Sequence, residues 1–135
     1  MRVFFYGLFM DENLLRSKGL NPLLSEKGFV PGYGLRIGQR ALLIKQEDEK
    51  AFGVTFTLPS SDVIQLYAEP SVQDYSPMDV TFIGSTGQAE QVVCYNLPAS
   101  SFKGSNGAYT KKLAEVAATL GFSPEYIAHI SSKSE

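Results

Sequence analysis

The sequence predicts an α+β fold in which a small bent β-barrel is flanked by helices. Alternating apolar and polar residues over 29–58 are typical of half-buried strands. Glycines between positions 32 and 38 interrupt this stretch and favour tight curvature, which suits a small barrel. Apolar residues recur at helical spacing over 109–120 and predict an amphipathic helix near the C-terminus.

The length of 135 residues is common for one domain, and the 44% hydrophobic content can build one sizeable core. We therefore expect a single domain over 1–135, with a flexible tail over 131–135. Twelve basic and fourteen acidic residues give a net charge of -2, without a block of like charge. This composition argues against nucleic acid as a partner.

The apolar runs are far shorter than the roughly 20 residues that span a bilayer. The N-terminus also lacks the features of a signal peptide, so we expect no membrane association and a cytoplasmic location. Cys94 is the only cysteine of the sequence and lies in a strand-like segment, where it is expected to be a small buried hydrophobe. His129 has no second histidine with which to share a metal, and we expect no metal site.

The N-terminal residues predict a strand followed by a short helix. Arg2–Tyr6 is rich in β-branched and aromatic residues and indicates a buried strand that Gly7 stops. Asp11 is placed to cap a helix through 14–16, which Gly19 ends.

The middle of the chain predicts a loop, a strand hairpin and a second helix. We expect a loop over 21–26 and, because it is charged and lies between two apolar runs, a hairpin tip over 46–50. Residues 60–62 can start a helix over 63–67, and Pro70 ends it.

The C-terminal half predicts two strands and two helices. Strands are expected over 78–83 and 91–97, joined by a turn over 84–88. Gly121 ends the helix that contains 109–120, and the sequence Ser-Pro-Glu at 123–125 starts the last one.

Two segments contain candidate binding and catalytic groups. The backbone N–H groups of residues 7–10 lie in a loop before a helix, where they could hold a carboxylate or phosphate; a plain turn is the alternative. Glu69 lies among aromatic residues over 66–75, and partial desolvation would favour proton exchange near neutrality. The alternative is a solvated surface glutamate, which applies more strongly to Asp74. Arg36 and Arg40 share a strand face and could reach an anionic substrate, but we favour their interpretation as solvated or salt-bridged strand residues.

Five segments together resemble the γ-glutamylcyclotransferase-like family, in a small bacterial branch. In chain order they are VFFYGLFM at 3–10, GYGLRIG at 32–38, AFGVTF at 51–56, LYAEPSV at 66–72 and CYNLP at 94–98. The resemblance covers roughly residues 2–130. It implies a bent barrel of mixed strands flanked by helices, with a pocket between the Tyr-Gly loop and the acid segment.

The resemblance also implies a reaction without a cofactor. The free α-amino group of a γ-glutamyl unit attacks its own side-chain amide carbonyl, which releases an amine and closes 5-oxoproline. Glu69 would be the catalytic acid/base, and positioning of the substrate would supply much of the rate. The implied substrate-binding residues are Tyr6, Gly7, Leu8, Phe9, Met10 and Tyr75.

The implied partner is a small γ-glutamyl or otherwise carboxylated metabolite, and the chain is expected as a monomer or weak homo-oligomer. The leaving amine stays open among glutathione, γ-glutamyl amino acids and γ-glutamyl amines. Leu8 stands where the family usually has a serine, and Pro70 where most members have a glycine. These departures favour the alternative, a non-catalytic domain that binds a small carboxylate or serves in protein interaction.

Overall fold

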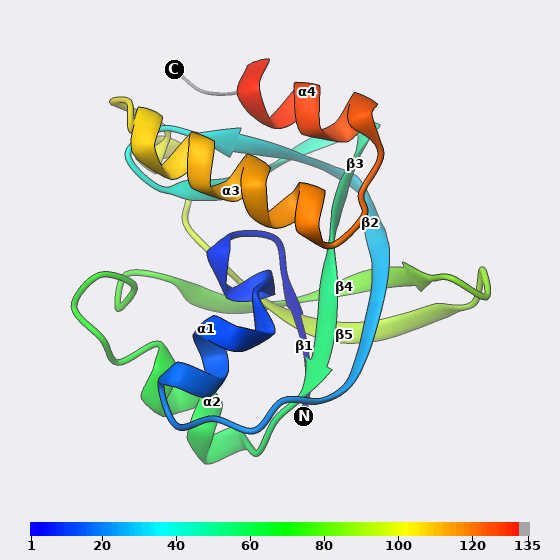
Figure 1. Ribbon diagram of the computed structural model, residues 1–135, viewed down its shortest axis with the longest axis vertical. Helices are drawn as coiled ribbons and strands as arrows, with labels where there is room; N and C mark the ends of the chain where they lie inside the picture. The colour runs from blue at the N-terminus through cyan, green and yellow to red at the C-terminus, as the bar shows by residue number, and fades with distance from the viewer. Residues whose placement is uncertain (133–135) are drawn as a thin grey trace.

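A computed structural model describes residues 1–132, and its strands form a closed barrel in the order β1-β3-β2-β4-β5 (Figure 1). The strands are β1 (Arg2–Phe5), β2 (Leu23–Ile37), β3 (Ala41–Thr57), β4 (Ser76–Gly84) and β5 (Ala89–Asn96). Strands β1 and β5 close the barrel as a parallel pair, whereas the other neighbours are antiparallel. The predicted α+β barrel of mixed strands is therefore confirmed.

Helices cover the barrel on two sides. They are the 3-10 helix η1 (Leu8–Met10), α1 (Glu12–Ser17), α2 (Ser60–Leu66), the 3-10 helix η2 (Ala99–Ser101), α3 (Gly107–Thr119) and α4 (Pro124–Ser132). In Figure 1, α3 and α4 lie together over the upper part of β2 and β3, and α1 and α2 lie at the lower end. The end of β1 lies between these two groups of helices.

The long β2–β3 hairpin corrects two predictions. Residues 46–50 do not form a hairpin tip: Pro31 pairs with Lys50 and Tyr33 pairs with Lys45, so 46–49 bulge out of β3 opposite Gly32. Gly32 has a φ of +84°, which suits glycine. The predicted loop over 21–26 is also wrong, because β2 already begins at Leu23.

Other local predictions are confirmed. The Asp11 side chain accepts a hydrogen bond from the Asn13 amide at 2.9 Å and caps α1. The Ser123 hydroxyl accepts from the Tyr126 amide at 3.2 Å at the start of α4. This helix continues through Ser132, within the predicted flexible tail, and the remaining tail residues 133–135 lie outside the described part of the chain.

The core fills the barrel and the space under α3 and α4. Phe4, Phe56 and Phe82 are at most 1% exposed inside it, and Leu113 of α3 and Ile130 of α4 are fully buried. Cys94 is also buried, as predicted. Across the described residues, no helix combines the length and the apolar character that a membrane crossing requires.

Candidate functional site

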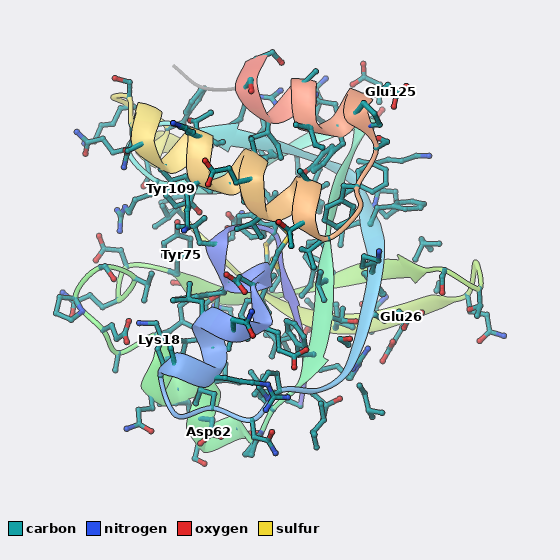
Figure 2. The ribbon with its side chains drawn as sticks, viewed as in Figure 1. Lys18, Glu26, Asp62, Tyr75, Tyr109 and Glu125 are labelled. Atoms are coloured by element: carbon teal, nitrogen blue, oxygen red, sulfur yellow. The ribbon has the colours of Figure 1, made fainter. Side chains whose placement is uncertain are left out.

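A cavity of about 790 Å³ lies where the end of β1 meets the β2–β3 turn, the segment before β4 and the start of α3. Its volume falls in the range of small-molecule sites in proteins. Figure 2 labels two of its lining residues, Tyr109 from α3 and Tyr75 from the segment before β4. Residues distant in the sequence therefore share one site.

One side of the cavity is built from aromatic rings. The rings of Tyr67 and Tyr95 stack with centroids 4.0 Å apart and planes 6° apart. Phe9 meets Tyr67 edge to face at 5.9 Å, and Phe5 in turn meets Phe9 at 6.0 Å. We call Phe5, Phe9, Tyr67 and Tyr95 the aromatic wall, and it presents mainly apolar surface to a ligand.

The other side is polar and contains Arg40. Within residues 1–132, Arg40 is the only charged residue that lines the cavity. Its guanidinium donates to the Ser71 carbonyl at 3.4 Å and to Oδ2 of Asp74 at 3.3 Å. Beside it, the Asn106 side chain donates to the Gln39 carbonyl at 3.1 Å. This side can therefore receive an anionic group.

Tyr75 connects the two sides. Its ring lies 6.1 Å from that of Tyr67, and the Arg40 guanidinium lies 5.7 Å from its centroid. The Tyr75 hydroxyl donates a short hydrogen bond to the Ala41 carbonyl, which holds the ring in place. The cavity thus has an aromatic side and a cationic side with one ring in contact with both.

Tyrosine hydroxyls around the cavity bond to the protein itself. The Tyr6 hydroxyl donates to the Tyr95 carbonyl or Oδ1 of Asn96, at 3.0 and 3.1 Å. The Tyr109 hydroxyl accepts from the Leu8 amide at 3.3 Å. Burial raises the pKa of Tyr109 to about 12 and that of Tyr6 well above its ordinary value. These phenols are neutral near pH 7 and serve as scaffold.

The Tyr-Gly loop contributes most of its predicted residues to the cavity. Tyr6, Gly7, Leu8 and Phe9 line it, but the Met10 side chain is 1% exposed and belongs to the core. The Leu8 amide is bonded to Tyr109, and the Met10 amide donates to the Gly7 carbonyl at 3.0 Å. Anion binding by the loop amides therefore stays a prediction, with two of these donors already engaged.

Glu69 lies at the rim, and its carboxylate points to a lysine. Nζ of Lys18 lies 2.9 Å from Oε1 and 3.0 Å from Oε2, and the Glu69 side chain is 37% exposed. Residues 70–72 line the cavity directly after it, whereas Glu69 itself does not. Its role as acid/base stays a prediction that requires the ion pair to open.

Comparison with known proteins identifies other structures that have the same fold. The sequence matches no family model and no curated protein. A solved structure named γ-glutamyl cyclotransferase superposes with a TM-score of 0.77 at 14% identity, over 98% of this chain and 86% of that one. The chain has the γ-glutamylcyclotransferase-like fold. The resemblance seen in the sequence is thereby confirmed at the level of the fold.

Two further structures share the γ-glutamylcyclotransferase-like fold. An uncharacterized protein from Homo sapiens has a TM-score of 0.76 at 16% identity, over 98% of this chain and 86% of that one. YkqA from Bacillus subtilis has a TM-score of 0.77 at 19% identity over 98% of this chain. The chain spans about half of YkqA, 53% of its length.

Several residues that line this cavity were not predicted from the sequence. Tyr67 and Tyr95 lie in two of the matched segments, but the sequence indicated only a helix residue for Tyr67 and a strand residue for Tyr95. Tyr109 was assigned only to the buried face of its helix. An available signal was the use of tyrosine where a plain apolar residue would suffice, since a buried hydroxyl needs a partner. For Arg40, contact with an anionic substrate was the less favoured alternative, and the structure places it in the lining.

Proposed function

We propose that the cavity binds a small carboxylated metabolite, with its carboxylate at Arg40. The observation that carries this proposal is that Arg40, among the residues that the structure describes, is the only charged residue that lines the cavity. Arginine presents a planar fork of donors that matches a carboxylate. Within residues 1–132 no carboxylate lines the cavity, and the Asp74 carboxylate beside Arg40 lies outside the lining.

The present partner of Arg40 can be exchanged at low cost. The side chains of Arg40 and Asp74 are 37% and 61% exposed, and their nearest atoms are 3.3 Å apart. Exposed pairs of this kind contribute about 1 kcal/mol or less. A ligand carboxylate can therefore replace Asp74, or share Arg40 with it, without a large loss.

A γ-glutamyl compound is the ligand class that we favour. It has an α-carboxylate for Arg40 and a side-chain amide that continues toward the rest of the cavity. The fold shared with a protein named γ-glutamyl cyclotransferase supports this choice. A soluble metabolite also fits the cytoplasmic location expected from the sequence.

Cyclisation of that ligand is the second candidate function, favoured by the position of Glu69 directly before the lining residues 70–72. The α-amino nitrogen would bond to the side-chain carbonyl carbon, and the bond from that carbon to the amide nitrogen would break. Glu69 would take a proton from the α-ammonium and return it to the departing nitrogen, which also receives the second proton that the attacking nitrogen loses on ring closure. The products are 5-oxoproline and the released amine as its ammonium form. Its pair with Lys18 is partly exposed and can open for this step.

Calorimetric titration tests the binding proposal. Wild-type protein is titrated with γ-glutamylethylamide and with the same compound whose α-carboxylate is converted to a carboxamide. We expect only the carboxylate form to bind, and Arg40→Gln to weaken it about 10-fold or more. Arg16→Gln is the matched control, because Arg16 is an exposed arginine of α1 paired with Glu12. Equal binding of both compounds would refute the proposal.

Release of 5-oxoproline tests the second candidate. Wild-type protein is incubated with a panel of γ-glutamyl compounds and compared with Glu69→Gln, which keeps the shape and removes the ionisable group. Loss of release in Glu69→Gln, but not in the control Glu12→Gln, would identify Glu69 as the acid/base. Binding without any release from well-folded wild-type protein would leave the chain as a binding domain.

A further inference from the structure

The distribution of charge and aromatic rings around the cavity restricts the ligand further, and this inference rests on the proposed function. We infer that the ligand carries one carboxylate and an apolar arm, so that monocarboxylated γ-glutamyl amides are favoured over dicarboxylates such as γ-glutamyl peptides. The arm would lie on the aromatic wall while the carboxylate occupies Arg40. For the cyclisation reaction, the arm is the leaving amine.

The aromatic wall favours an apolar arm. Its rings form a continuous series, from Phe5 through Phe9 and Tyr67 to Tyr95, with centroid separations of 6.0, 5.9 and 4.0 Å. Leu8 and Val72 add further apolar lining. A polar arm here would lose water without gaining comparable partners, whereas an apolar arm gains from leaving water.

Three of the tyrosine hydroxyls at the cavity are already engaged with the backbone. Tyr6 and Tyr75 donate their protons to the carbonyls of Tyr95 and Ala41, and the Tyr109 hydroxyl accepts from Leu8. The protons of Tyr6 and Tyr75 are thus used within the protein, and the Tyr109 oxygen already accepts one hydrogen bond. The lining is thus less polar toward a ligand than its tyrosine content suggests.

Within residues 1–132, the lining offers no second cation for a dicarboxylate. Over residues 1–132, Arg40 is the only cationic lining residue, and Lys18 lies outside the lining with both oxygens of Glu69 on its ammonium. A second carboxylate on an arm that lies on the aromatic wall would therefore face rings and no cation. Transfer of an unpaired carboxylate to such surroundings is unfavourable.

Three matched compounds test this inference by calorimetric titration: γ-glutamylphenethylamide, γ-glutamylethylamide and γ-glutamylglycine. The first two share one carboxylate and differ in the arm; the third has a short arm with a second carboxylate. We expect the phenethylamide to bind at least about 10-fold more tightly than the ethylamide, as burial of a phenyl ring implies. We expect γ-glutamylglycine to bind more weakly than both.

Substitution of the aromatic wall locates the arm. Tyr67→Leu removes the ring that stacks on Tyr95 but keeps an apolar side chain, and it should reduce the ratio of phenethylamide to ethylamide affinity several-fold. Tyr67→Phe retains the ring and should retain most of that ratio. Circular dichroism and thermal unfolding establish that both variants are folded. If Tyr67→Leu proves unfolded, Phe9→Leu provides the same comparison.

The outcomes separate this inference from the proposed function. If none of the three compounds binds to folded wild-type protein, both the proposed function and the inference fail. If they bind but γ-glutamylglycine equals or exceeds the ethylamide, or the ethylamide equals or exceeds the phenethylamide, the proposed function stands and the inference is overturned. A strong preference for the phenethylamide that Tyr67→Leu leaves intact would also overturn it, because the arm would then lie elsewhere.

Discussion

Lys18 binds both carboxylate oxygens of Glu69, with its Nζ atom 2.9 Å from Oε1 and 3.0 Å from Oε2. Lys18 follows α1 and Glu69 follows α2, so the pair joins the ends of two short helices beside the cavity. The Lys18 ammonium also lies 6.0 Å from the centre of the Phe9 ring. The pair therefore holds the Glu69 carboxylate outside the aromatic wall.

Removal of the Lys18 ammonium should have a small effect on stability. The two side chains are 29% and 37% exposed, and pairs of this kind contribute about 1 kcal/mol or less. We expect Lys18→Met to lower the free energy of unfolding by less than about 1 kcal/mol in urea denaturation. A larger loss, undiminished by added salt, would mean that the pair anchors the fold and does not open readily.

Gly7 provides space for the hydroxyl of Tyr109. A Cβ atom on Gly7 would lie 2.5 Å from this oxygen, whereas the next ring atom, Cζ, is 3.9 Å away. We expect Gly7→Ala to cost about 1–3 kcal/mol through overpacking, and Tyr109→Phe about 1 kcal/mol through loss of the acceptor for Leu8. The double variant should lose less free energy of unfolding than the two single variants together. Without the Tyr109 hydroxyl, the new Cβ atom at position 7 no longer meets the oxygen that it would overlap. Strict additivity in this double-mutant cycle would contradict the contact.

Asn96 connects two strands that are not neighbours in the barrel. Its side-chain amide accepts from the Leu43 amide at 2.9 Å and donates to the Leu43 carbonyl at 2.9 Å, which links β5 to β3. We expect Asn96→Leu to destabilise the chain by about 2–4 kcal/mol, since both backbone groups lose their partner. Asn13→Leu, at an exposed position, should stay within about 0.5 kcal/mol of wild type. Similar unfolding midpoints for the two variants would refute this role.

Buried tyrosines should make the fold sensitive to alkali. Burial raises the pKa of Tyr109 from 10.0 to about 12 in the folded chain, and it also raises those of Tyr6 and Tyr67. The folded chain thus retains protons that the unfolded chain releases above pH 10, so stability is fully present below pH 10 and falls as pH rises toward 12. Each such group contributes up to about 1.4 kcal/mol per pH unit.

Denaturation at a series of alkaline pH values measures this dependence. Tyr109→Phe should reduce the slope of the unfolding free energy against pH between 10 and 12, because one of the shifted groups is gone. An unchanged slope would show that Tyr109 titrates alike in both states.

Elements with local signals could be predicted from the sequence. Alternation and apolar runs located β1, β4 and β5, and helical periodicity with capping residues located α3 and α4. In contrast, the bulge over 46–49 was predicted as a hairpin tip, because exposed charged residues occur equally at a tip and in a bulge. Only its pairing partners, Pro31 and Tyr33, distinguish the two.

For the site, the resemblance found in the sequence was enough to predict a pocket between the Tyr-Gly loop and the segment around Glu69 on a γ-glutamylcyclotransferase-like fold. Tertiary structure alone decided what lies between them. Lys18 and Glu69 are 51 residues apart, and the stacked rings of Tyr67 and Tyr95 come from different elements. Such contacts depend on how elements pack against the barrel, and local patterns encode which residues are buried but not which residues they meet.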